Sequence, residues 1–246
     1  MDTALVSGMM GRVSETSSAP RTARERARAE LTAEILETAR RHLEVDGAAA
    51  LSLRAVARDL GMVSSAVYRY VPSRDDLLTR LIIDAYNALG DAVDAAEAAC
   101  GREDFLGRWL ALGHATRDWA CAHPQEWALI YGSPVPGYAA PQDTIGPGTR
   151  VSATMTQILG DAAVAGRGPQ PEPVPDDVAA SLGPLREFVG NAVPDSWLVR
   201  GVMARTQLFG HVSLELDGQF NATIDDLRAF FDHVLHLVAR DLGLTD

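Results

Sequence analysis

Lysine is absent from this chain, and all 22 basic residues are arginine. A GC-rich genome also favours arginine, so the absence does not by itself mark each arginine as a binding residue. Cysteine is scarce as well: there are only Cys100 and Cys121, and no CxxC spacing indicates a structural zinc site. We therefore expect two buried, unpaired thiols, no bound metal and no cofactor.

Long apolar runs are missing too, so no segment reaches the length of a membrane span. Residues 1–20 are rich in Ser, Thr, Gly and Ala, and they lack the basic start and apolar stretch of a secretory signal. We expect this segment to be a disordered tail and the protein to be cytoplasmic.

No run of residues alternates apolar and polar side chains as a half-buried strand does. Apolar residues recur instead at helical spacing, so the sequence predicts an all-α fold. Two stretches, 131–148 and 165–177, are too rich in Pro and Gly to be helical, and the second is expected to be an exposed extended linker. The predicted helices span residues 21–46, 52–60, 64–71, 73 to beyond 95, 103–122, 124–132, 149–163, 177–191, 195–219 and 223–242.

The net charge of −11 argues against a protein that coats nucleic acid over its whole surface. The charge is unevenly distributed, however. Residues 21–80 hold 11 arginines against 9 acidic residues, whereas residues 81–246 hold 10 arginines against 22 acidic residues. Four arginines at the start of the first region would either enter a minor groove as a flexible arm or form an ordinary solvated face. They are Arg21, Arg24, Arg26 and Arg28.

The segment after the first predicted helix has the spacing of a helix-turn-helix. Ser52 is a good N-cap for the second helix, and Gly61 ends it. After a short turn, Ser64 is expected to cap a third helix of about two turns, which Pro72 closes. Two helices joined this tightly cross steeply, so the second can project from the surface and fit a DNA major groove.

The third predicted helix has little room for a core face and many side chains suited to another molecule. It lies in the segment SSAVYRYVPSRDDLL, which begins at Ser64. Its hydroxyl groups and cation suit phosphates and base edges, and the methyl groups of Val67 suit thymine. A second interpretation stays open, in which the tyrosines pack on the first helix and the arginines are solvated charges. The candidate contacts are Ser64, Ser65, Val67, Tyr68, Arg69 and Tyr70, with Arg74 on a second phosphate at the next helix start.

Residues 31–82 resemble the N-terminal DNA-binding domain of the TetR family of transcriptional repressors. The resemblance rests on the segment SLRAVARDLGMVSSAVYRYVPSRDDLL. The sequence departs from the family pattern at Tyr70, where His is common, at Val71, where Phe is usual, and at Arg74, where Lys is usual. The arginine keeps the cation and the valine stays apolar. The positions that match are Ser52, Val56, Ala57, Gly61, Val63, Ser64, Val67, Tyr68, Ser73 and Leu77.

The resemblance implies roles for individual residues of a helix-turn-helix DNA-binding domain at 21–72. Tyr68 and Arg74 would contact phosphates, and Ser52 and Arg54 would contact the flanking backbone. The residues that would read bases are Ser65, Ala66 and Arg69.

The same resemblance implies that residues 73–246 form a helical ligand-binding and dimerisation domain. Aromatic side chains of this domain would line an apolar cavity, although aromatic residues at helical spacing also form ordinary cores. Because this part of the chain is acidic, we expect a largely apolar or cationic effector. The predicted ligand-binding residues are Trp109, His114, Trp119, Trp127 and Tyr131.

The last two predicted helices carry apolar residues on more than one face. A helix that is apolar on two sides must bury both. One face can pack on its own chain and the other on a partner's, which would build an intermolecular four-helix bundle in a homodimer. The predicted interface residues are Leu208, Val212, Leu227, Phe230, Phe231 and Val234.

Other functions have weaker support in the sequence. His233 and His236 have the spacing of metal ligands, as do His211 and Glu215, but neither pair has a third ligand at helical spacing. We expect no enzyme activity; a small-molecule-binding helical protein without DNA binding is the alternative, and a metal-dependent enzyme is a remote one. The sequence predicts a homodimeric transcriptional regulator. It would repress from double-stranded operator DNA, or less often activate, and would release the operator when a small-molecule effector binds.

Overall fold

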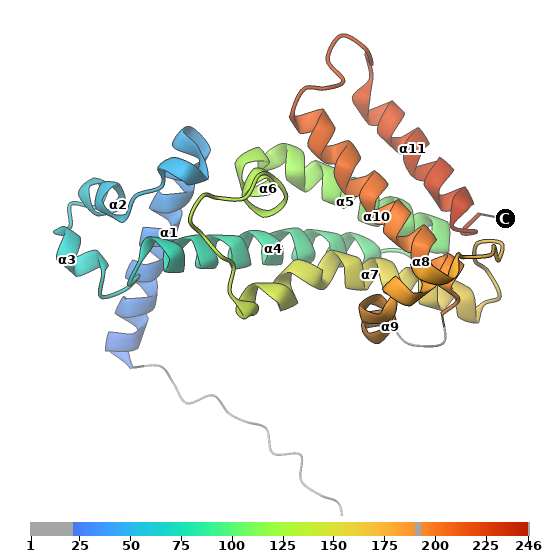
Figure 1. Ribbon diagram of the computed structural model, residues 1–246. Helices are drawn as coiled ribbons and strands as arrows, with labels where there is room; N and C mark the ends of the chain where they lie inside the picture. The colour runs from blue at the N-terminus through green and yellow to red at the C-terminus, as the bar shows by residue number, and fades with distance from the viewer. Residues whose placement is uncertain (1–21, 190–192, 246) are drawn as a thin grey trace, which may run out of the picture.

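The computed structural model describes residues 22–189 and 193–245, and every regular element in these ranges is helical (Figure 1). The predicted all-α fold is confirmed. Within these ranges no helix is long and apolar enough to cross a membrane. The predicted disordered tail at 1–20 lies outside the described residues.

The N-terminal domain consists of three helices, α1 (Ala23–Ala50), α2 (Leu53–Asp59) and α3 (Ser64–Val67). A capping box starts α1: the Thr22 hydroxyl accepts from the backbone N–H of Glu25, and the Glu25 carboxylate accepts from the backbone N–H of Thr22. Gly47 has a φ of 73° and leaves helical geometry, so the regular part of α1 ends where the sequence predicts.

The turn between α2 and α3 is fixed by backbone hydrogen bonds around Gly61. Met62 N–H donates to the carbonyl of Ala57, and Gly61 N–H donates to the carbonyl of Arg58, which is the Schellman pattern. Gly61 has a φ of 64°, a conformation that residues with a β-carbon rarely adopt. The turn directs the chain away from α2 and sets the crossing of α2 and α3.

Helix α4 (Arg74–Ala98) begins as predicted at Ser73, whose hydroxyl accepts from the backbone N–H of Asp76 at 3.0 Å. Its first turns pack into the N-terminal domain, where they complete a core with α1, α2 and α3. The α4 residues of this core are Leu77, Leu78 and Leu81.

The rest of α4 belongs to a second core. Ala85, Leu89 and Val93 pack among the buried residues of the C-terminal domain. The domain boundary predicted between residues 72 and 73 therefore falls at the start of a helix that serves both cores. A rigid helix, rather than a loop, connects the two domains.

The C-terminal domain adds α5 (Phe105–Ala122), α6 (Pro124–Tyr131), the 3₁₀ helix η1 (Gln142–Thr144), α7 (Ile145–Val164), α8 (Asp176–Ser181), α9 (Gly183–Val189), α10 (Asp195–Leu216) and α11 (Leu227–Asp241). Helices α5 and α7 pack along α4, and α10 and α11 form a pair that runs obliquely to α4 (Figure 1). The domain thus extends from the N-terminal domain along α4.

Some predicted helix ends are wrong. Helix α7 begins inside a stretch predicted to be non-helical, because Pro147 lies in its first turn, where the missing N–H is not needed. The helix predicted at 177–191 is two helices, α8 and α9. The last helix starts at Leu227 because Asp226 caps it by accepting from Ala229 N–H.

The proline-rich segment 165–177 is non-helical up to Pro175, as predicted, but it is not wholly an exposed linker. Pro169 is buried, and Gly168 lies against the indole ring of Trp197. A β-carbon at Gly168 would be 2.2 Å from that ring. This part of the segment is therefore docked on α10.

Both cysteines are free, as expected, but they are not both buried. Cys100 is half-buried, and Cys121 is exposed on the outer side of the last turn of α5, whose Trp119 and Ala120 are buried. Within the described part of the chain, no group of three or more His, Cys, Asp or Glu side chains is placed to hold a metal ion.

A buried cation links α5 to α4 and α7. The Arg108 side chain is fully buried, and its Nε is 2.5 Å from Oε1 of Glu97. Its Nη1 donates a hydrogen bond to the carbonyl of Arg102. Its Nη2 lies 2.8 Å from Oδ2 of Asp161, which makes an ion pair, but the angle between the groups is not that of a hydrogen bond. The more exposed Arg102 guanidinium contacts the same two carboxylates. Removing the buried partner would leave Glu97 without its main counter-charge.

We expect Arg108→Met to lower the free energy of unfolding by about 3–5 kcal/mol, the usual cost of breaking a buried ion pair. Arg102→Met removes a guanidinium from the same two carboxylates at the surface and should cost about 1 kcal/mol or less. Thermal and urea unfolding of both variants measures the difference. Equal destabilisation by the two substitutions would contradict a specific role for burial of Arg108.

Candidate functional site

The recognition segment, Ser64 to Tyr70, contains a shorter helix than the sequence predicted. α3 is a single turn, and Val63 rather than Ser64 is its N-cap. The chain then tightens, because Tyr70 N–H donates to the carbonyl of Val67 in an i→i+3 bond. Pro72 disfavours the α region for the residue before it, which explains why a second regular turn does not form.

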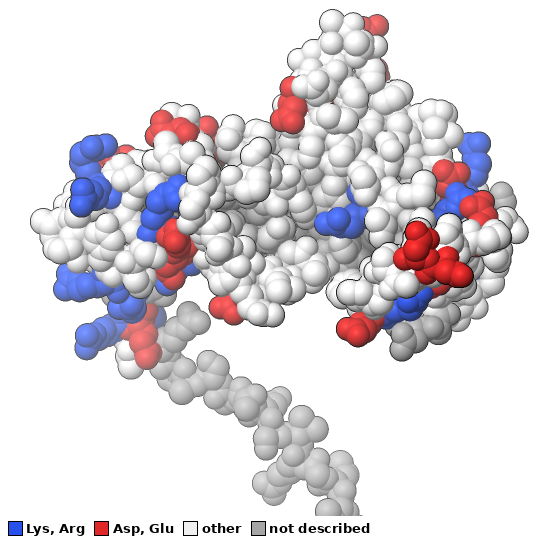
Figure 2. Space-filling view, viewed as in Figure 1, with Lys and Arg blue, Asp and Glu red and all other residues white. Residues whose placement is uncertain are grey.

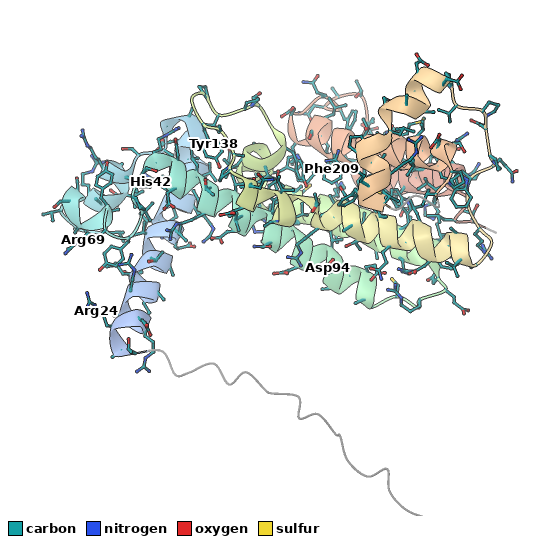
Figure 3. The ribbon with its side chains drawn as sticks, turned by 60° about the horizontal axis from the view of Figure 1, so that its bottom comes forward. Arg24, His42, Arg69, Asp94, Tyr138 and Phe209 are labelled. Atoms are coloured by element: carbon teal, nitrogen blue, oxygen red, sulfur yellow. The ribbon has the colours of Figure 1, made fainter. Side chains whose placement is uncertain are left out.

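Most side chains of the recognition segment face outward. Ser64, Ser65 and Arg69 are exposed, and Tyr68 is 42% exposed. Figure 3 shows Arg69 pointing away from the body of the molecule. Val67 is fully buried in the N-terminal core, so its predicted contact with thymine is wrong. Ala66, the remaining predicted base contact, is half-buried.

Tyr70 is engaged by Arg28 of α1. The Arg28 guanidinium lies 5.2 Å from the centroid of the Tyr70 ring, and its Nη2 donates to the carbonyl of Arg69 at 2.9 Å. Tyr70 is therefore half-buried against α1, as the alternative interpretation of the tyrosines holds, rather than free for DNA. Arg24, Arg26 and Arg28 are part of helix α1, so they do not form a flexible arm. Arg21 lies outside the described residues. Arg24 projects from the same end of the molecule as Arg69 (Figure 3).

Arg74 closes the end of α1 in this structure. Its Nε donates to the carbonyl of Leu51, and its Nη2 donates to the carbonyls of Ala48 and Ala49, at 2.9–3.2 Å. The end of a helix leaves such carbonyls short of backbone donors, although that of Ala48 also accepts from the backbone N–H of Leu51. The side chain is partly buried, which contradicts its prediction as a free phosphate contact.

The start of α4 is also a poor anion site. The Ser73 hydroxyl already satisfies one backbone N–H, and Asp75 and Asp76 place negative charge in the first turn. Asp76 is paired with Arg80 at 2.9 Å. The predicted second phosphate at this helix start is therefore not supported by the geometry.

The start of α2 fits the prediction better. Ser52 is the N-cap residue, but its side chain accepts no capping hydrogen bond from its own helix, and Arg54 is exposed. Sequence reasoning missed the contact that fixes α2 on α1, where His42 Nε2 lies 2.7 Å from Oδ2 of Asp59. Arginine side chains cluster at the end of the molecule that α1, α2 and α3 form (Figure 2).

A cavity of about 440 Å³ lies in the C-terminal domain, within the usual range for small-molecule sites. Its walls come from α7, α9 and α10, with Gly168 and Pro169 from the docked proline-rich segment and Leu242 from the end of the chain. Most of the lining is apolar. The polar lining side chains are Thr149, Ser152, Thr156, Trp197 and Arg205.

The residues predicted to bind a ligand do not line this cavity. The four aromatic residues among them pack in the domain core instead, because α5 and α6 lie between α4 and the α10–α11 pair, and His114 is half-buried beside that core. Trp109 Nε1 donates to the carbonyl of Leu235, and Trp127 Nε1 donates to the Ser213 hydroxyl. His114 contacts Asp232, and Trp119 stacks on His123. Tyr131 packs on Tyr86, Trp127 and Phe209. Burial there raises the pKa of the Tyr131 hydroxyl.

A different sequence signal marks the observed cavity. Helix α7 carries small residues about one turn apart along one face, which leaves space where a larger side chain would fill it. Gly201 of α10 faces the same space. The small residues of α7 in the wall are Gly148, Ser152, Thr156, Gly160 and Ala163.

Two family profiles match the chain. One, described as "Bacterial regulatory proteins, tetR family", matches residues 35–81, and one, described as "Tetracyclin repressor-like, C-terminal domain", matches residues 109–238. The HTH-type transcriptional regulator Rv1816 of Mycobacterium tuberculosis is 43% identical over 229 residues, which cover 89% of this chain and 95% of that protein. The chain belongs to the TetR family. This TetR-family protein is accordingly a DNA-binding transcriptional regulator.

Solved structures agree with the family assignment. The structure of SCO4313, described as a regulatory protein, is 36% identical with a TM-score of 0.71, over 88% of this chain and 98% of that one. A TetR-family regulator from Shewanella sp. PV-4, at 16% identity and a TM-score of 0.58, shares the fold over 86% of this chain and 97% of that one.

The predicted dimer residues of this TetR-family chain divide into two groups. Leu208, Val212 and Phe231 are buried within their own chain, so they cannot form a seam with a partner. Phe230 is 39% exposed, and Leu227 and Val234 are half-buried. The exposed large apolar residues of α10 and α11 that the prediction missed are Val202, Met203, Leu214 and Leu237.

We expect Arg74→Met to lower the thermal stability of this TetR-family protein, because it removes three hydrogen bonds to carbonyls at the end of α1. The expected cost is about 1–3 kcal/mol. The slope of log affinity against log salt for DNA should stay unchanged.

Arg54→Met is the matched control. It should leave stability unchanged and reduce the salt slope by about 0.9 for each phosphate that the arginine no longer neutralises. If Arg74→Met instead flattened the slope and kept the stability, the phosphate role of Arg74 would stand. DNA binding over a salt series and thermal unfolding give both readouts.

Proposed function

We propose that this protein is a homodimeric repressor in the cytoplasm that releases double-stranded operator DNA when a small molecule occupies the cavity of its C-terminal domain. One observation carries the proposal: α4 is buried in both domains, so the outward-facing recognition segment and the domain that holds the cavity share one rigid helix. No catalytic role is proposed for any residue.

The DNA contacts in this proposal come from α2 and the recognition segment. Ser65, Ala66 and Arg69 read base edges in the major groove, and Ser64 and Tyr68 contact phosphates. Ser52 and Arg54 contact the flanking backbone through a hydroxyl and a cation at the start of α2. All of these side chains are exposed except those of Ser52 and Ala66, which are half-buried. This exposure supports the assignment.

The effector acts through α7, which forms a cavity wall and is tied to α4. Arg150 of α7 donates to the backbone carbonyl of Asn87 and pairs with Asp91 and Asp94 at 2.6–2.7 Å. Thr154 adds a hydrogen bond to Asp94. A shift of α7 on ligand binding therefore moves α4.

Movement of α4 displaces the DNA-binding domain because Arg74, the first residue of α4, is hydrogen-bonded to carbonyls at the end of α1. In addition, the Arg40 guanidinium of α1 lies 2.8 Å from Asp84 of α4 and 3.8 Å from Glu126 of α6. Successive major grooves on one face of DNA lie about 34–36 Å apart, so a small rotation of each α4 in a dimer misplaces the two recognition segments. A ligand that favours the misplaced arrangement lowers operator affinity.

The dimer seam uses the outer face of α10 and α11. Met203, Leu214, Phe230 and Leu237 are exposed apolar residues on these two helices. Gly210 of α10 has open space around it, so another backbone can approach closely. Figure 2 shows few charged side chains over this pair of helices, which suits a bundle formed with a second copy.

We expect the purified protein to enrich, from sheared DNA of its source, fragments that contain two related half-sites about one helical turn apart. Sequencing the captured fragments and repeating the binding with purified fragments test this. Arg69→Ala should change which half-site variants are bound, because base contacts carry sequence preference. Capture without any shared sequence would contradict operator recognition.

We expect Phe230→Glu to convert the dimer into folded monomers, because it puts an unpaired carboxylate in an apolar seam at a cost of several kcal/mol. Operator affinity should collapse with it, although no DNA-contacting residue changes. Analytical ultracentrifugation, circular dichroism and a gel shift measure the three effects.

Val164→Glu is the control, because this valine is 92% exposed at the end of α7 and should tolerate the charge in an intact dimer. Phe231→Glu should instead unfold the chain, since Phe231 is fully buried in its own core. A Phe230→Glu protein that stays dimeric would place the seam elsewhere.

A further inference from the structure

The cavity in the C-terminal domain has a single charged side chain among its described lining residues, Arg205 of α10. None of those lining residues is acidic. Besides Arg205, the wall contains the hydroxyl groups of Thr149, Ser152 and Thr156 and the indole of Trp197. The other lining residues are apolar. They include Met155, Leu159, Leu185, Phe188, Val193 and Leu198.

Arg205 is held in place but not neutralised. Its Nε donates to the Ser152 hydroxyl at 3.1 Å, and its guanidinium lies 4.9 Å from the centroid of the Phe209 ring. Among the described residues no carboxylate pairs with it. Seven other arginines of this domain do pair with carboxylates: Arg102, Arg108, Arg117, Arg150, Arg186, Arg200 and Arg228. Arg205 therefore keeps N–H groups available for an oxyanion.

The indole ring of Trp197 forms part of the wall. Its Nε1 is buried and finds no acceptor among the described protein atoms. The ring can occupy this position because residue 168 is glycine; a β-carbon at Gly168 would overlap the ring. Trp197 and Arg205 are eight residues apart on α10, which separates them by about 12 Å at 1.5 Å per residue.

We propose that the cavity takes a monoanionic, mostly apolar molecule, such as an aliphatic carboxylate. Its oxyanion lies at Arg205 and Ser152, and its apolar body extends along α10 toward Trp197. The proposal rests on the proposed function, because it names the chemical class of the effector. It keeps the apolar part of the apolar or cationic effector that the acidic composition suggested, and it replaces the cation by an anion. Charges farther than about 8 Å are largely screened at physiological salt, whereas Arg205, although exposed, lies at contact distance from a molecule in the cavity.

The anionic end would lie next to the helix that the effector must move. Gly148, which lines the cavity, sits against the ring of Tyr86 on α4, and a β-carbon added to this glycine would lie only 3.3 Å from that ring. Tyr86 in turn donates to the carbonyl of Ile130 on α6. A carboxylate that draws Arg205 inward therefore acts beside the contacts between α7, α4 and α6.

Calorimetric titration with three probes of matched length tests the class: decanoate, decanol and decyltrimethylammonium, each below its micelle concentration. We expect decanoate to bind about tenfold or more tightly than decanol, because a hydrogen bond between a guanidinium and a carboxylate is stronger than one to a neutral hydroxyl. The cationic probe should not bind. Equal binding of decanoate and decanol, or tighter binding of the cation, would overturn the proposal.

Variants locate the binding within the cavity. Arg205→Gln should remove the preference for decanoate over decanol, and Arg205→Lys should keep part of it. Arg200→Gln, which removes a charge from the same helix but not from this cavity, should change nothing. Gly201→Leu should abolish decanoate binding, because a β-carbon fits there at 3.7 Å from Leu159 and the longer side chain enters the cavity. A preference for decanoate that survives Arg205→Gln would refute the role of Arg205.

Gel shifts with operator DNA separate this proposal from the proposed function. Decanoate that binds in the Arg205-dependent way but does not release DNA would support the effector class and contradict ligand-controlled repression. Operator binding with no binding of decanoate would overturn the effector class and leave DNA recognition intact.

Discussion

Helix α4 is the element on which the rest of the structure depends, because its apolar face is buried in two different cores. The first turns complete the small N-terminal core, which α1, α2 and α3 cannot close by themselves. The later turns lie at the centre of the C-terminal domain, between α5 and α7. A helix that is packed along its whole length moves as a unit, so neither domain can shift against it without repacking.

Arginine placement follows from this arrangement. With no lysine in the chain, arginine supplies every permanent side-chain cation, and its planar group with five N–H donors can satisfy several acceptors at once. Arg74 uses this capacity to close the end of α1, Arg150 to hold α7 on α4, and Arg108 to fill a buried junction. The arginines left exposed in the N-terminal domain, such as Arg54 and Arg69, form the cationic surface.

The C-terminal domain shows why the overall charge of a region is a poor guide to a site within it. The region is strongly acidic, yet many of its carboxylates are paired with arginines or face solvent, and none of the described cavity-lining residues is acidic. Among the described lining residues Arg205 supplies the one guanidinium, and a charge at contact distance acts more strongly than distant charges, which are screened. The aromatic side chains, which look like ligand contacts in the sequence, are instead used for the core, where their large apolar surface is most stabilising.

The sequence by itself determined the fold class, the family and most helix positions, because helical periodicity, caps such as Ser73 and the Gly61 turn act over a few residues. It also placed the DNA-binding segment. Only the tertiary structure decided which way side chains point: Val67 inward, Tyr70 against Arg28, Arg74 onto the end of α1, and Phe231 into the core while Phe230 stays outside. The cavity was likewise decided by tertiary packing, because an empty space is a property of how α7, α9 and α10 meet, and no local pattern in one helix fixes what the facing helix leaves unfilled.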